Sequence, residues 1–235
     1  MRTKVSIVIP CYNERERIPS FLDEIRQYAN ANTSIELELI IVDDGSTDGT
    51  GTIVEQYGLE NDLKISVLIS PENSGKGHAV TRGVLSSTGA YVLFCDADGA
   101  TPIQEERKLR DAIRGQVKMA FGRRKRRQRK FTRWIMGRVF SGCISILLRK
   151  RIYDSQCGFK MFEGSTAKHL FAQIDEQRFA FDVEIMALAM QANLRWATVE
   201  VEWAEIPGGN VRVIRDGLQM LLALQRIRKK VLQSR

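Results

Sequence analysis

The stretch AYVLFCDADGAT, residues 90–101, joins a short apolar run to two closely spaced carboxylates. Residues 91–95 read YVLFC, which has the length and the side chains of a buried strand. Asp96 and Asp98 follow at once, separated by a single alanine. In a continuing strand both aspartates would point the same way. Two carboxylates that face the same way repel each other unless a proton or a cation lies between them.

Asp96 and Asp98 supply the oxygen ligands that Mg²⁺ and Mn²⁺ prefer. Mg²⁺ usually takes one or two protein carboxylates together with the phosphates of a substrate. The pair therefore predicts a divalent metal that carries a nucleotide diphosphate. A solvated, aspartate-rich turn is the structural alternative, because the dipeptide Asp-Gly is common in turns. The position directly after a buried strand favours the metal.

Similar apolar, strand-like runs recur along the chain of 235 residues. They lie at 5–9, 37–42, 65–69, 91–95, 117–121 and 196–203. Helix-like stretches separate several of them, among others at 14–29, 76–88 and 102–114. Continuous apolar strands that alternate with helices predict an α/β fold, with a mainly parallel sheet covered by helices on both faces.

Four polar loops each follow a predicted strand directly. They read PCYNE (10–14), DDGSTDG (43–49), SPENSGKG (70–77) and DADGAT (96–101). Ligands of such sheets bind beyond the carboxyl ends of the strands, so these loops predict the site. Lys76 lies between two glycines, where it can neutralise a phosphate. A P-loop is disfavoured, because Gly77 stands where that motif requires serine or threonine.

Asp43 and Asp44 follow the predicted strand at 37–42. A carboxylate in this place can accept the N3–H group of a uracil ring, which would select the base. The alternative is a turn and helix cap built by Asp44, Ser46 and Asp48. Both interpretations stay open, with one aspartate for each role.

The net charge of +8 is concentrated in one stretch. Residues 123–133, RRKRRQRKFTR, hold eight basic residues and no acidic one, so the remainder of the chain is formally neutral. A local basic patch predicts an anionic partner, which could be nucleic acid, lipid headgroups or phosphates. Nucleic acid is disfavoured, because the patch lacks interleaved aromatic residues and a recognisable nucleic-acid-binding fold.

Two segments with apolar turns and clustered basic residues follow, at 134–148 and 218–235. The first is either a buried core helix or an interfacial helix whose basic flank lies on anionic lipid. No run reaches the roughly 18 to 20 apolar residues that a bilayer span requires, so peripheral contact with a membrane is expected. Dispersed cysteines and the lack of a signal-peptide pattern favour the cytoplasmic side.

Six motifs, in this order, resemble those of the family 2 glycosyltransferases with the GT-A fold. They are VSIVIPCYNE, IIVDDGSTDGT, NSGKGHAV, DADGAT, DSQCGFKMF and FDVEI. Among the polyprenyl-phosphate sugar synthases of this family, the chain is most similar to the dolichyl-phosphate β-glucosyltransferases. The resemblance implies one GT-A domain over 1–235, closed by amphipathic C-terminal helices. Its donor half would be 1–122, and its acceptor and membrane-facing half 123–235.

The resemblance also implies roles for single residues. Residues matched to the donor site are Pro10, Tyr12, Glu14, Asp43, Asp44, Lys76, Asp96 and Ala97. Asp96 and Asp98 would hold Mg²⁺ or Mn²⁺ beside the diphosphate, and Arg124 and Arg133 match arginines that grip the acceptor phosphate. The implied catalytic set is Asp96, Asp98, Asp154 near the sugar and Asp182, with Glu184 in the same acceptor-side motif. One departure is Ala100, where the mannosyl synthases carry glutamine.

The activity implied is the inverting transfer of a hexose, glucose by resemblance, from a UDP-sugar to a polyprenyl or dolichyl phosphate. A phosphate monoester is already an anion near pH 7, so a strong general base is not required. One alternative stays within the family and uses a polysaccharide or a soluble acceptor. Another uses a different donor, such as GDP-mannose.

Overall fold

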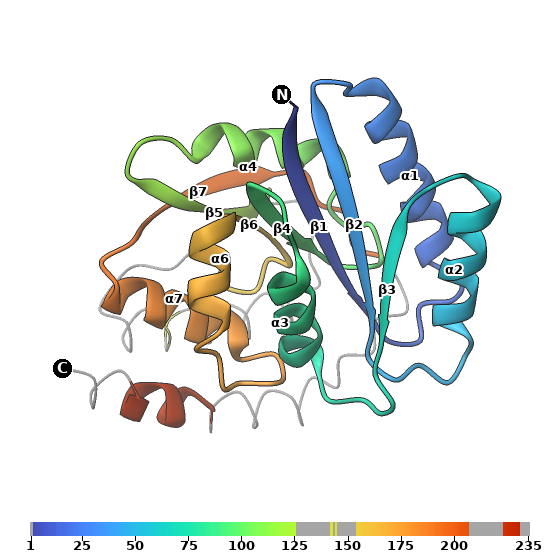
Figure 1. Ribbon diagram of the computed structural model, residues 1–235. Helices are drawn as coiled ribbons and strands as arrows, with labels where there is room; N and C mark the ends of the chain where they lie inside the picture. Colours follow the sequence, from blue (N-terminus) through green and yellow to red (C-terminus); the bar gives the residue numbers. More distant parts are fainter. Residues whose placement is uncertain (1, 126–141, 143, 145–153, 207–222, 231–235) are drawn as a thin grey trace.

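A computed structural model describes residues 2–125, 142, 144, 154–206 and 223–230 (Figure 1). The described strands are β1 (Thr3–Cys11), β2 (Ile35–Asp43), β3 (Ile65–Ile69), β4 (Tyr91–Cys95), β5 (Val117–Arg124), β6 (Phe159–Glu163) and β7 (Arg195–Val201). The helices are α1 (Ile18–Ala31), α2 (Thr50–Glu60), α3 (Lys76–Ser86), η1 (Ile103–Glu105), α4 (Glu106–Ala112), α6 (Gly164–Phe171) and α7 (Phe181–Gln191). Arg133 and the predicted helix at 134–148, apart from residues 142 and 144, lie outside the described residues.

The described strands form one sheet in the order β3-β2-β1-β4-β6-β5-β7. β1 pairs in parallel with β2 and β4, β2 with β3, and β5 with β7. The predicted α/β fold with a mainly parallel sheet is therefore confirmed. β6 is the exception, because it runs antiparallel to both β4 and β5. The sequence did not predict this strand, since Lys160 interrupts its apolar run.

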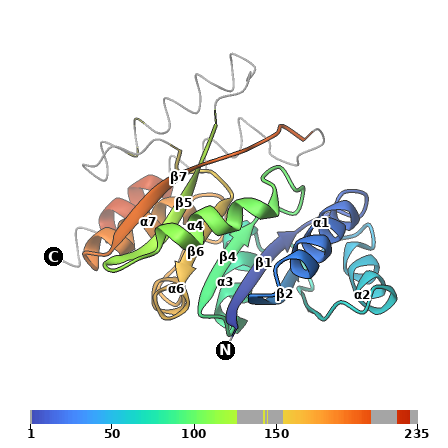
Figure 2. The same cartoon turned by 90° about the horizontal axis from the view of Figure 1, so that it is seen from above.

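Helices cover both faces of the sheet and bury an apolar core on each (Figure 2). Along β1, Ile7 and Ile9 pack on the side of α1, α2 and α4, whereas Val8 packs on the side of α3, α6 and α7. This alternation follows from the two-residue period of a strand. Because both faces are buried, the strands read as continuous apolar runs. Figure 1 shows α1 and α2 near the β2–β3 end of the sheet, and α6 and α7 near the other end.

Residues 223–230, within the predicted segment 218–235, are helical. Ala223, Leu224 and Ile227 are buried in the core beside α3, α6 and α7, whereas Arg228 and Lys229 are exposed. The predicted amphipathic character is confirmed for these residues, but their apolar side packs on protein and not on lipid. Within the ranges that the structure describes, no helix is long and apolar enough to cross a membrane.

The carboxylate of Glu38 ties β2 to β1 and to the segment before β4. It accepts hydrogen bonds from the hydroxyl of Ser6 and from the backbone N–H and hydroxyl of Thr88, and it pairs with Lys4 at 2.9 Å. Burial alone would raise the pKa of Glu38, but these donors outweigh it and lower the pKa to about 2. The carboxylate is therefore stabilised in the folded state.

Glu38 is accordingly expected to make the fold sensitive to acid. Its contribution is complete above the unfolded pKa near 4.5 and is lost as the pH falls through about 2. Between pH 6 and pH 3 the unfolding free energy of the natural chain should fall by about 1 to 2 kcal/mol more than that of Glu38→Gln. Urea titrations at both pH values measure this difference, and parallel losses in the two proteins would contradict it.

Candidate active site

The candidate residues meet at one edge of the sheet, beyond the carboxyl ends of its parallel strands. Asp43 ends β2, beside Cys11 at the end of β1, and Asp96 follows β4 directly. Arg124 ends β5. Since β6 runs in the opposite direction, the segment 154–158 before it arrives at the same edge. The antiparallel strand thus brings a motif from the second half of the chain to the loops of the first half.

The loops after β1 and β2 are bonded to each other. The N–H of Asn13 donates to the Ser46 hydroxyl at 2.9 Å, and the side-chain oxygen of Asn13 accepts the Thr47 N–H at 2.9 Å. The N–H of Glu14 donates to the Thr50 hydroxyl at 2.9 Å. Asn13 has a φ of 55°, in the left-handed region where asparagine is tolerated. These bonds fix the backbone around the predicted donor residues.

Asp43 and Asp44 are both buried and both bind backbone N–H groups. Asp43 accepts the Ser46 N–H at 2.9 Å, which closes the turn after β2. Asp44 accepts the N–H groups of Ser74 and Gly75, at 3.0 and 2.7 Å. The turn alternative was therefore wrong about Asp44: Asp43 closes this turn, and Asp44 holds the glycine loop instead. Direct contact of either with a donor remains a prediction.

Three other matched donor residues lie beside these loops. Pro10 is buried within β1, and Tyr12 is half-buried just after it. Ala97 is buried between the two aspartates. The structure therefore brings them to the same edge as Asp43 and Asp96, and their contact with a donor remains a prediction.

Lys76, the first residue of α3, reaches across to the aspartate loop. Its ammonium lies 2.5 Å from one carboxylate oxygen of Asp96. Burial lowers the pKa of Lys76, but the negative charges of Asp96 and Asp182 outweigh burial and raise it. The lysine is therefore held charged at the carboxylates, as the phosphate-neutralising role requires.

Two carboxylates of this edge, Asp98 and Glu14, lie in surroundings that disfavour their negative charge. Asp98 accepts the Ala100 N–H at 3.0 Å, and burial and then Asp96 raise its pKa. One oxygen of Glu14 pairs with Arg17 at 2.6 Å, while the other is buried and has no hydrogen-bond partner among the described residues. Burial is the main cause of the raised pKa of Glu14, and Asp98 contributes to it.

The chemistry of the Asp96–Asp98 pair fits a divalent cation. The two residues offer two carboxylates directly after β4. The described residues contain no cluster of three or more histidine, cysteine or acidic side chains suited to a metal. Two carboxylates nevertheless suffice for Mg²⁺ or Mn²⁺ when substrate phosphates complete the coordination.

Gly158 explains how the segment before β6 meets the aspartate loop. Its carbonyl accepts the Asp96 N–H at 3.1 Å. A Cβ atom at this position would collide with the Asp96 carboxylate. Any other residue would displace the Asp96 carboxylate from its observed position, which accounts for the glycine in the motif DSQCGFK.

Arg124 is held rigidly by Asp154 and Trp203. Its guanidinium donates Nε to one oxygen of Asp154 at 2.8 Å and Nη2 to the other at 2.6 Å, a bidentate pair. The same guanidinium lies over the ring of Trp203, 5.3 Å from its centroid. Burial would lower the pKa of Arg124, but the hydrogen bonds and the charge of Asp154 outweigh burial. The pKa is therefore raised, and the charge of Asp96 adds to this effect. Asp154 thus orients the predicted phosphate-gripping arginine.

Asp182 is buried at the start of α7 and pairs with Lys160 of β6 at 2.7 Å. Lys160 is fully buried, donates also to the Cys157 carbonyl at 2.7 Å, and lies over the ring of Phe94. Burial raises the pKa of Asp182 even though Lys160 opposes the shift. Asp182 is therefore buried in the protein interior, and its negative charge helps to raise the pKa of Lys76.

Sequence reasoning missed two residues of this arrangement. Lys160 was not singled out, although a lysine inside the otherwise apolar run FKMF is a signal of a buried charge that needs a partner. The second is Trp203, whose contact with Arg124 joins distant parts of the chain and cannot be read from a pattern. Arg133 cannot be placed, because it lies outside the described residues.

Comparison with known proteins identifies the protein family to which this fold and this candidate site belong. Residues 6–179 match Glycosyl transferase family 2. The chain therefore belongs to this family, as its six motifs predicted.

Several relatives with curated names are dolichyl-phosphate beta-glucosyltransferases. The protein of that name from Dictyostelium discoideum is 36% identical over 97% of this chain and 75% of its own length. The human protein is 33% identical over 92% of this chain and 72% of its length, and the Saccharomyces cerevisiae protein is 31% identical over 95% and 74%. These matches confirm the resemblance to this branch of the family.

Solved structures show the same fold at low sequence identity. Glucosyl-3-phosphoglycerate synthase from Mycobacterium tuberculosis, in complex with Mn²⁺, UDP-glucose and phosphoglyceric acid, gives a TM-score of 0.76 at 17% identity, over 97% of this chain and 80% of that one. Mannosyl-3-phosphoglycerate synthase from Rubrobacter xylanophilus gives 0.75 at 20% identity, over 99% and 74%. The GT-A fold predicted from the motifs is thereby confirmed.

Proposed function

We propose that this chain transfers glucose from UDP-glucose to dolichyl phosphate, with inversion at the anomeric carbon. The glucosyl and dolichyl parts rest on relatives of 31 to 36% identity that carry this name. The observation that supports it best is the juxtaposition of Lys76 and the Asp96–Asp98 pair with the clamped guanidinium of Arg124. Lys76 and the two aspartates suit a leaving diphosphate, and Arg124 suits an attacking phosphate.

On the donor side, the chain neutralises and fixes the diphosphate. Asp96 and Asp98 are the residues that would hold a divalent cation, which would supply Lewis-acid stabilisation of the departing UDP. Lys76 adds a fixed positive charge at the same place, where it requires no reorganisation during the reaction. The loops built on Asp43 and Asn13 surround the position proposed for the uridine.

On the acceptor side, Arg124 binds and orients the phosphate of the lipid. A guanidinium fork matches phosphate oxygens better than an ammonium does. Asp154 takes the Nε–Nη2 edge of the guanidinium, so Nη1 and the second N–H of Nη2 are the donors left for the phosphate. Asp154 and Trp203 restrict the rotation of the group, which would align the attacking oxygen with the anomeric carbon. The phosphate monoester is the nucleophile and already an anion, so no side chain must remove a proton from it.

Contact with the cytoplasmic face of a membrane follows from the lipid acceptor. The basic run 123–133 and exposed Lys229 would lie on anionic headgroups. The division into a donor half, 1–122, and an acceptor half, 123–235, is proposed with it. β6 and β7 of the second half lie in the same sheet as the strands of the first half, which supports the proposal of a single domain.

Transfer of radiolabel from UDP-glucose into the organic phase tests the proposal. Dolichyl phosphate and 3-phosphoglycerate are compared as acceptors, and GDP-mannose and UDP-N-acetylglucosamine as donors, each with and without Mg²⁺ or Mn²⁺. We expect metal-dependent label in the lipid product from UDP-glucose alone. Label transferred only to 3-phosphoglycerate would replace the lipid acceptor by a soluble one. Transfer from another donor would overturn the glucosyl assignment.

Trp203 is expected to assist the acceptor through Arg124. Trp203→Leu removes a ring whose attraction for the guanidinium is worth about 0.5 to 2 kcal/mol, so KM for dolichyl phosphate should rise about 2- to 30-fold. Trp203→Phe keeps an aromatic face and should recover most of this loss. Steady-state kinetics with both variants measure the effect, and a Leu variant with unchanged KM would refute the contribution of the ring.

A further inference from the structure

The segment 173–178, between α6 and α7, lies against the start of α3. The N–H of His78 donates to the Gln177 carbonyl at 2.9 Å. Gly77 is so close to this segment that a Cβ atom would collide with the carbonyls of Glu176 and Arg178. Because Lys76 directly precedes these residues, the position of the segment constrains the backbone that carries the Lys76 ammonium.

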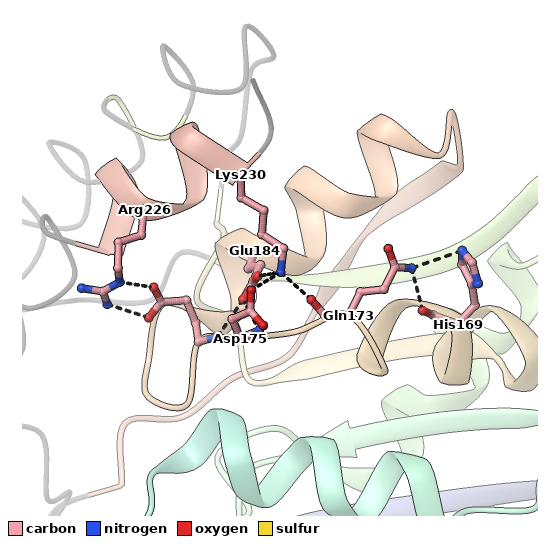
Figure 3. A network of polar contacts seen from close by, with 7 residues as sticks. His169, Gln173, Asp175, Glu184, Arg226 and Lys230 are labelled. Carbon is pink, nitrogen blue, oxygen red and sulfur yellow. Dashed lines mark hydrogen bonds and ion pairs between the residues drawn. The ribbon is translucent and has the colours of Figure 1, made fainter. Parts of the chain in front are cut away.

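On its other side, the same segment is bound by the C-terminal helical residues 223–230 (Figure 3). Arg226 forms a bidentate pair with Glu176, with Nε and Nη2 at 2.8 and 2.9 Å from its two oxygens. Lys230 lies 2.6 Å from Asp175 and 2.5 Å from the carbonyl oxygen of Gln173. The helix therefore holds the segment at Gln173, Asp175 and Glu176.

Glu184 of α7 links the C-terminal helix to the segment 173–178. One of its oxygens accepts Lys230 at 2.6 Å, and the other accepts the N–H groups of Asp175 and Glu176 at 3.1 and 2.8 Å. The side chain of Glu184 is only 2% exposed and that of Glu176 only 10%. Carboxylates buried to this extent need their partners. Arg226 itself is 63% exposed, so water screens its side of the pair, and the loss of this arginine costs less than the breaking of a fully buried pair.

We propose that Arg226 and Lys230 are positioning residues for the donor site. They clamp segment 173–178 against the start of α3 and thereby seat Lys76 at the donor diphosphate. Asp44 restrains the same glycine loop from the opposite side through Ser74 and Gly75. The clamp itself is a property of the fold, and its effect on the donor rests on the proposed function.

Hydrogen–deuterium exchange tests the clamp without any ligand. In Arg226→Ala, the amides of residues 76–80 should exchange about tenfold faster than in the natural chain, because the restraint on their neighbours is lost. Arg228→Ala is the matched control, since Arg228 lies on the same helix and is exposed. Glu176→Gln, which keeps the shape but removes the charge, should reproduce the increase. Unchanged exchange at 76–80 in Arg226→Ala and Glu176→Gln would overturn the proposal.

The effect on the donor is tested by a double-mutant cycle on the dissociation constant of UDP-glucose. Arg226→Ala should weaken binding about 5- to 10-fold, with a melting temperature close to that of Arg228→Ala, and should have no further effect in Lys76→Ala. Additive losses would show that Arg226 does not act through Lys76 and would overturn this step. If the natural chain binds no UDP-glucose, the proposed function fails, while the exchange experiment still decides whether the clamp exists.

Discussion

Replacing Asp98 with asparagine is expected to lower the turnover number more than about 100-fold, which is the scale seen when a group that stabilises developing charge is removed. Asparagine keeps the oxygen that accepts the Ala100 N–H but removes the charge that would hold the cation. The substitution also relieves the repulsion between Asp98 and Asp96. The free energy of unfolding should therefore not decrease.

Initial-rate measurements and urea titrations on the same preparation test both parts of this expectation. Asp62→Asn is the control, because Asp62 is exposed, remote in sequence and has a φ of 48°, which asparagine tolerates. It should leave rate and stability unchanged. Full activity in Asp98→Asn would refute the metal role of this carboxylate.

Replacing Asp154 with asparagine is expected to lower kcat/KM for dolichyl phosphate about 30- to 100-fold, because hydrogen bonds to charged partners contribute roughly 2 to 3 kcal/mol. Asparagine cannot accept both bonds of the Arg124 fork, so the guanidinium loses its fixed orientation. The loss should fall mainly on dolichyl phosphate and much less on KM for UDP-glucose, because Asp154 pairs with Arg124 of the proposed acceptor site, although the resemblance places Asp154 near the sugar.

Glu202→Gln provides the comparison for Asp154→Asn. Glu202 pairs with Lys125 at 2.8 Å, one residue from Arg124, but both side chains are at least 40% exposed. Exposed pairs contribute little, so this variant should behave like the natural chain. A loss in Asp154→Asn that falls on UDP-glucose in place of dolichyl phosphate would contradict the assignment of Asp154 and Arg124 to the acceptor.

The strands were predictable wherever polar loops bound them. The expected strands at 65–69 and 91–95 coincide with β3 and β4, because each is an apolar run followed by a sharp change to polar residues. β6 escaped prediction because its central Lys160 is compensated by Asp182, 22 residues further along the chain. No local pattern reveals that such a charge is neutralised.

The site was predictable where charged residues directly follow the strands of the predicted parallel sheet. Asp96, Asp98 and Lys76 each follow a predicted strand, and the rule for parallel sheets was enough to bring them together. The pair of Arg226 with Glu176 spans 50 residues, and the contact of Arg124 with Trp203 joins two separate strand ends. Such contacts depend on how helices and strands pack, so periodicity cannot predict them.

The central claim is a direct displacement, in which an acceptor phosphate held by Arg124 attacks a UDP-glucose held at Lys76, Asp96 and Asp98. The anomeric configuration of the lipid product tests it most directly. UDP-glucose carries an α linkage, and a single attack from the opposite face inverts it. We predict that proton NMR of the purified product shows only β-linked glucose phosphate. An α-linked product would contradict direct displacement, because retention of the linkage requires two successive displacements.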